Sequence, residues 1–208
     1  MESFITFLIY THAFFGGIGL ITGLTIVFIP KGTKKHVFLG KTFSLGMLTG
    51  SIISIFICLL PKHENLFLLL IGLFTIYLII IGNRCIQLKK NRATKTDYLI
   101  TYIMIGISLI MLILSIWYFI KGVNGYILYF FFGILGLRIA FGDLKLYKHR
   151  KLWLRSHVGK MLSALIASIT AFIIAGLQIN NVYAWLLPSV IGTIYIWYWI
   201  KKLKKEQV

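Results

Sequence analysis

The chain reads KKNRATKTD at residues 89–97 and continues with YLITYIMIGISLIMLILSIWYFI at residues 98–120. The first stretch carries four lysine and arginine residues, whereas the second carries no charged residue. About 20 apolar residues in a helix cross the hydrocarbon core of a bilayer, so residues 98–120 are long enough to span a membrane. We expect a helix, because a segment in lipid has to satisfy its backbone hydrogen bonds internally.

The same alternation of basic and apolar stretches runs along the whole chain of 208 residues. It predicts an all-α polytopic membrane protein in which one transmembrane domain covers residues 1–208. The seven expected spans use up nearly all of that length and are residues 4–29, 42–60, 66–82, 98–120, 125–142, 158–179 and 182–200.

Nineteen of the 22 lysine and arginine residues lie in alternate connecting segments, at residues 31–41, 84–95, 145–160 and 201–205. Short loops rich in lysine and arginine face the cytoplasm, so the N-terminus is expected outside and the C-terminus in the cytoplasm. We attribute the net charge of +17 to this topology and to contact with anionic lipid at the cytoplasmic face, and not to nucleic acid.

His12 lies inside the first expected span, and Gly16, Gly19 and Gly23 follow it on the same helical face. One interpretation is a close-packing face of small residues with a hydrogen-bonded imidazole. The other is a ligand or proton carrier beside a smooth wall where a flat cofactor lies, since an imidazole in hydrocarbon is costly.

His36 and His157 each stand where an expected span meets the cytoplasm. Two histidines on separate helices are the minimum for axial ligation of a b-type haem, or form part of a metal site. The alternative is a pair of interfacial histidines that contact lipid phosphate.

Arg138 is the only strong base well inside an expected span. It either extends towards the inner headgroups or pairs with Asp97 or Asp143, the two acids expected at the cytoplasmic end. An arrangement of arginine and aspartate facing a bundle interior would suit a haem propionate or a lipid phosphate.

Several motifs together resemble a family of small bacterial multispanning integral membrane proteins of unknown function. They are His12, the run from Lys31-Gly32 through His36 to Gly40, LRSHVGKM at residues 154–161, and the run from Trp185 through Pro188 to Gly192. The resemblance implies a multi-pass protein of the bacterial plasma membrane and no particular activity. It singles out His12, His36 and His157 as positions in recognisable motifs.

Three functions follow from these residues. The first is a redox protein that binds haem b, with His12, His36, His157 and Arg138 as the candidate cofactor-binding residues. The second is a small transporter or lipid-binding protein. Similar openings of the second and sixth spans suggest a parallel repeat, which would suit a carrier that works as a homodimer.

The third is a zinc-dependent intramembrane hydrolase, with His36, His157 and either Asp97 or Asp143 as metal ligands. No helix has a second histidine one turn away from the first, which weighs against this third function.

Overall fold

The computed structural model of the chain describes residues 2–179 and 181–205 and divides the chain into two compact units. The terminal unit comprises Met1–Ile79 and Met161–Val208, and the middle unit comprises Ile80–Lys160. The chain passes from one unit to the other inside α3 (Leu66–Leu88) and again inside α6 (Trp153–Ala171).

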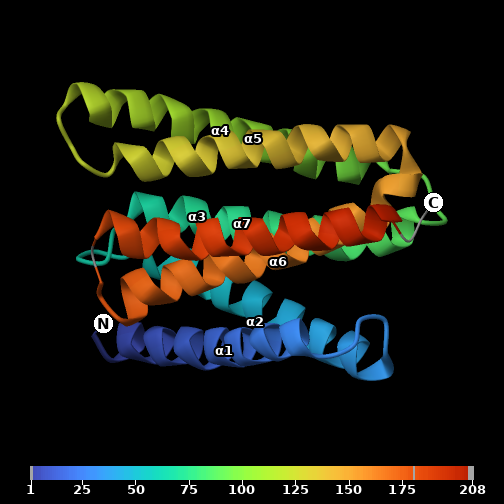
Figure 1. The fold of residues 1–208 in the computed structure, drawn as a ribbon. Helices are drawn as coiled ribbons and strands as arrows, with labels where there is room; N and C mark the ends of the chain where they lie inside the picture. Colours follow the sequence, from blue (N-terminus) through green and yellow to red (C-terminus); the bar gives the residue numbers. More distant parts are fainter. Residues whose placement is uncertain (1, 180, 206–208) are drawn as a thin grey trace. The chain divides into compact units, whose positions relative to one another are not determined.

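Two long helices open the terminal unit, α1 (Glu2–Phe28) and α2 (Lys34–Ile57), and they pack directly against each other (Figure 1). Glycines allow this close approach: a Cβ atom placed on Gly46 of α2 would lie 2.8 Å from the carbonyl oxygen of Phe15 in α1. Small residues have this role in membrane helices, because they bring two backbones into van der Waals contact.

The terminal unit also contains α7 (Val182–Lys205), which contacts the end of α1. The hydroxyl of Tyr195 donates to the carbonyl of Val27 over 3.4 Å. The Lys31 ammonium donates to the carbonyls of Ile26 and Val27 in the last turn of α1 and to that of Ile29 just after it. It also lies 5.4 Å from the ring centroid of Trp199. Partial burial lowers the pKa of Lys31. These contacts satisfy carbonyls that a helix end otherwise leaves without partners.

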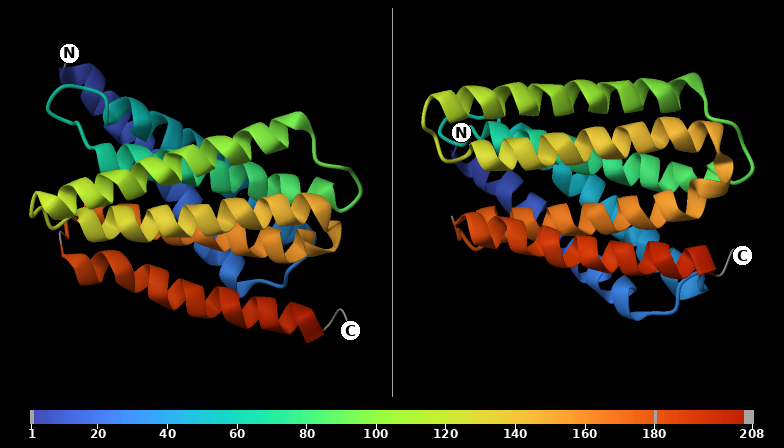
Figure 2. Two further views of the ribbon diagram at one scale, coloured as in Figure 1. Left: turned by 90° about the horizontal axis from the view of Figure 1, so that it is seen from above. Right: turned by 45° about the horizontal axis from the view of Figure 1, so that its top comes forward.

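The middle unit is built on α4 (Lys95–Ile120) and α5 (Tyr126–Lys148), an antiparallel pair that lies side by side in every view (Figures 1 and 2). The hydroxyl of Ser115 donates to the carbonyl of Tyr126 over 2.9 Å, beside the turn that joins the two helices. A short 3₁₀ turn, η1 (Arg150–Leu152), then connects α5 to α6.

The helical backbone of the terminal unit is irregular at two places, after α6 and inside α7. A π-helical turn, η2 (Phe172–Gly176), follows α6, and Pro188 lies inside α7. Both features leave backbone groups outside the regular hydrogen-bonding ladder of an α-helix.

The prediction of an all-helical fold is confirmed, because the described residues contain helices and no strand. Six helical stretches among them are long and apolar enough to cross a membrane: α1 to α5 and the stretch Arg150–Gly176. The seventh expected span coincides with α7, which is not one of the six. Its 24 residues include Pro188 and several tryptophan and tyrosine rings, and these lower its hydropathy.

Large apolar side chains are exposed on these helices. In the most apolar 18-residue stretch of α1, only 6% of the residues are buried, and Phe28 at the end of the helix is 83% exposed. A contiguous apolar surface of this kind needs a non-aqueous environment, which supports the assignment of these helices to a membrane.

The helix boundaries differ from the predicted ones mainly at the basic segments. α2 begins at Lys34 and not near residue 42, α3 continues to Leu88 and not to 82, and α6 begins at Trp153 and not at 158. Lysine and arginine are good helix formers, so they extend a helix beyond its apolar part. Thr33 caps α2, and its side chain accepts from the backbone N–H of His36.

Candidate functional site

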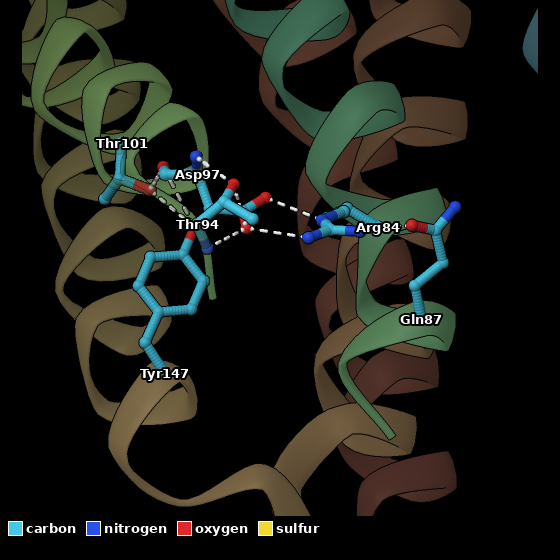
Figure 3. A network of polar contacts seen from close by, with 6 residues as sticks. All are labelled: Arg84, Gln87, Thr94, Asp97, Thr101 and Tyr147. Atoms are coloured by element: carbon cyan, nitrogen blue, oxygen red, sulfur yellow. Dashed lines mark hydrogen bonds and ion pairs between the residues drawn. The ribbon is translucent and has the colours of Figure 1, made fainter. Parts of the chain in front are cut away.

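Asp97 lies at the start of α4 and is held by groups from two elements (Figure 3). Thr94 is the N-cap residue of α4, and its backbone N–H donates to Asp97 Oδ2 over 2.6 Å. Arg84 of α3 donates to both carboxylate oxygens, from Nε over 2.8 Å and from Nη2 over 3.1 Å. This two-pronged contact fixes the end of α3 against the start of α4.

Tyr147 connects the end of α5 to the same place. Its hydroxyl donates to the carbonyl of Asp97 over 3.2 Å and lies 2.8 Å from Thr101 Oγ1 (Figure 3). Thr101 is fully buried, as is much of Tyr147, so their polar atoms depend on each other and on the Asp97 carbonyl.

A second ion pair joins α5 to α6. The Lys160 ammonium contacts Asp143 Oδ1, and the two residues are 4% and 0% exposed. Next to this pair, Nδ1 of His157 lies 2.8 Å from the carbonyl oxygen of Gly82 in α3. The ends of four helices in the middle unit are therefore held together by buried polar contacts.

Arg138 does not pair with either acid. Its side chain is exposed, and no ion pair of Arg138 is found among the described residues. The expected pairing with Asp97 or Asp143 is therefore corrected, because Arg84 and Lys160 occupy those carboxylates. Both partners belong to the basic segments of the sequence, Arg84 just after the third expected span and Lys160 at the start of the sixth. The extension of α3 to Leu88 makes Arg84 helical.

An open pocket of about 480 Å³ lies at the turn between α5 and α6. It is lined by Lys89, Lys148, His149, Arg150, Lys151 and Trp153. We call it the basic pocket. Its volume falls within the range of about 300–1,000 Å³ that is typical of small-molecule sites.

Two contacts shape the basic pocket. Lys89, which follows α3, places its ammonium 5.2 Å from the ring centroid of Trp153 at the start of α6. Arg150 donates from Nη1 to the carbonyl of Lys90 over 3.0 Å, which ties the turn after α5 to the turn after α3. The pocket thus combines cations from separate elements, and sequence order alone does not bring these together.

His12 makes an interhelical hydrogen bond in the terminal unit. Its Nδ1 lies 2.9 Å from the carbonyl oxygen of Gly50 in α2. Gly19 and Gly23 are buried, and side chains of Met47 and Phe43 fill the space beside them. The packing interpretation of this glycine face is therefore supported at these positions, since no flat space is left there.

His36 lies in the first turn of α2 in the terminal unit, whereas His157 belongs to the middle unit. The buried Nδ1 atom of His36 has no hydrogen-bond partner among the described residues. The convergence of these two histidines on one site stays a prediction.

The described part of the chain brings together no group of three histidine, cysteine, aspartate or glutamate side chains that could hold a metal ion. Asp97 and Asp143, proposed as zinc ligands, are instead bound to Arg84 and Lys160.

Comparisons of the chain with models of protein families, with curated proteins and with solved structures find no match. The function proposed for this chain therefore depends on its own residues and their geometry.

Proposed function

We propose that the chain is a seven-span protein of the bacterial plasma membrane that binds anionic phospholipid headgroups through its basic pocket. The N-terminus is outside, and the pocket faces the cytoplasm. Six apolar helices and the alternation of basic segments support the topology, with α7 as the seventh span.

The basic pocket is the observation that carries this proposal. Five of its six lining residues are lysine, arginine or histidine, and none is an acid. Phosphate oxygens accept hydrogen bonds from arginine and lysine in strong charge-assisted contacts. The anionic cytoplasmic leaflet attracts each such residue near its surface by about 1 kcal/mol.

The nearby acids do not offset the charge of the pocket. Asp97 and Asp143 are almost completely buried, and each is already paired with a cation that does not line the pocket. No carboxylate lines the pocket, so an anionic lipid headgroup can pair with its lysines and arginine without displacing an acid of the chain.

Cysteine labelling tests the orientation. In a variant without Cys58 and Cys85, single cysteines replace Lys62, Lys121 or Lys148, and intact cells are treated with a membrane-impermeant maleimide. We expect labelling at positions 62 and 121, and labelling at 148 only after the cells are opened. Labelling of position 148 in intact cells would contradict the topology.

Lipid binding tests the function itself. The protein is purified in nanodiscs of phosphatidylcholine and phosphatidylglycerol, and bound lipids are counted by native mass spectrometry. We expect retained phosphatidylglycerol in the wild type and its loss in the double variant Lys148→Gln/Lys151→Gln. Lys34→Gln/Lys35→Gln is the matched control, because both lysines are exposed and do not line the pocket. Equal retention in both double variants would refute the proposal.

Binding of haem b is a second candidate, favoured by the hydrogen bond of His12. A backbone carbonyl only accepts, so Nδ1 of His12 carries a proton, and in the neutral ring Nε2 then holds the lone pair. Iron-binding histidines are commonly oriented by this type of contact.

Absorption spectroscopy tests the haem candidate. Protein purified from haem-replete cells should show a Soret band that weakens in His12→Ala, His36→Ala or His157→Ala. A colourless preparation with no bound haem would remove this candidate and leave the lipid proposal in place.

A further inference from the structure

The charge of the basic pocket exceeds what one phosphate can neutralise. Lys89, Lys148, Arg150 and Lys151 are four strong bases, His149 adds a fifth basic group, and the lining contains no carboxylate. A phospholipid with a single phosphodiester brings one negative charge. It would leave most of the cations in the pocket without a partner.

The cations also come from different elements. Lys89 follows α3, Lys148 is the last residue of α5, and Arg150 and Lys151 belong to η1. Two of them are held in place: Arg150 by the Lys90 carbonyl and Lys89 over the Trp153 ring. A ligand that satisfies cations on separate walls needs more than one anionic group.

The volume agrees with a ligand of that size. About 480 Å³ is far more than one phosphate group fills, and the pocket is open to its surroundings. Trp153 is one of its lining residues, and tryptophan prefers the boundary between headgroups and acyl chains. Basic pockets between membrane helices on the cytoplasmic side bind headgroups that carry several phosphates.

We infer that the basic pocket selects ligands with two phosphate groups close together, and that a membrane lipid of this type is preferred over a lipid with one phosphate. This inference rests on the proposed function and names its ligand class. The shared chemistry is a pair of phosphates, whether joined to a lipid or present in a soluble diphosphate.

The test compares ligands at equal phosphate content. The protein is placed in nanodiscs that contain phosphatidylcholine with either phosphatidylglycerol or half the molar fraction of cardiolipin, which has two phosphates. A third arm adds inorganic pyrophosphate to nanodiscs of phosphatidylcholine alone. Affinities come from native mass spectrometry, and the variants are Lys148→Gln/Lys151→Gln with Lys34→Gln/Lys35→Gln as control.

We expect cardiolipin to bind about tenfold more tightly than phosphatidylglycerol in the wild type and in the control variant. The pocket variant should lose this preference. Tight binding of pyrophosphate in addition to cardiolipin would support the inference, because both ligands carry two phosphates. Equal affinity for cardiolipin and phosphatidylglycerol would overturn the inference and leave the proposed function standing, whereas binding of neither lipid would refute both.

Discussion

Asp143 of α5 and Lys160 of α6 form an ion pair with almost no access to solvent. Burial of two charges costs several kcal/mol per ion, and a good pair roughly repays that cost. The pair therefore adds little net stability, but each partner depends on the other.

Removing one partner should be far more costly than removing both. We expect Asp143→Asn to lower the free energy of unfolding by about 3–5 kcal/mol, because it leaves a buried ammonium without its counter-charge. The double variant Asp143→Leu/Lys160→Met should recover most of that loss. Unfolding in mixed micelles of denaturing and mild detergent measures both.

Lys145→Gln is the control, since Lys145 lies on the same helix and is exposed. It should change stability by less than about 0.5 kcal/mol. If Asp143→Asn were as mild as Lys145→Gln, the buried pair would not exist as described.

In each ion pair, the position of the acid was predicted from the sequence, but the identity of its basic partner was not. Asp97 and Asp143 were expected at the cytoplasmic end because the chain has just five acids and the basic segments mark that end. Their partners were missed, because Arg84 and Lys160 were counted as loop cations. Helix α3 continues past Arg84, beyond its expected end at residue 82, whereas Lys160 lay in the first turn of the expected span 158–179 and was assigned to the cytoplasmic face.

The close contact between α1 and α2 depends on individual glycines. A Cβ atom on Gly46 would lie 2.8 Å from a backbone oxygen of α1. For a Cβ atom on Gly50, the nearest atom of α1 would be the backbone nitrogen of Gly16, at an ordinary contact distance of 3.5 Å. The two glycines are one turn apart on α2, and both are buried.

This difference predicts opposite effects for the same substitution. Gly46→Ala should destabilise the protein by about 1–3 kcal/mol, because the clash is with backbone atoms that cannot move aside. Gly50→Ala should be neutral or stabilising by up to about 1 kcal/mol, as alanine favours the helix. The midpoint of thermal unfolding in detergent distinguishes the two. Equal loss in both variants would show that this helix contact is not as close as the structure indicates.

The element pattern itself was largely predictable. Apolar runs of about 20 residues fix the helices, and Gly16, Gly19 and Gly23 indicated a packing face on α1. The basic pocket was not predictable, since Lys89 lies 59 positions before Lys148 and the two meet only when α3, α5 and α6 are in place. The charge pattern predicts that the basic segments share one membrane face, but it carries no information on which bases line the same pocket.

In the molecule as a whole, the basic side chains discussed above fall into two groups: those paired with acids of the chain and those that line the basic pocket. Two bases are neutralised by the chain's own acids: the half-buried Arg84 pairs with Asp97, and the buried Lys160 pairs with Asp143. The bases of the pocket are left for an external anion. This division links the fold to the proposed function, because the buried pairs hold the helix ends from which the pocket is built.

The most direct test of lipid binding in the pocket is photo-crosslinking with a phosphatidylglycerol analogue that carries a diazirine on its headgroup. The protein is reconstituted with this lipid, irradiated and digested, and the modified peptides are identified by mass spectrometry. We predict modification concentrated in residues 148–153, and its loss in Lys148→Gln/Lys151→Gln but not in Lys34→Gln/Lys35→Gln. Modification spread evenly over all basic segments, and unchanged by the pocket variant, would contradict the account.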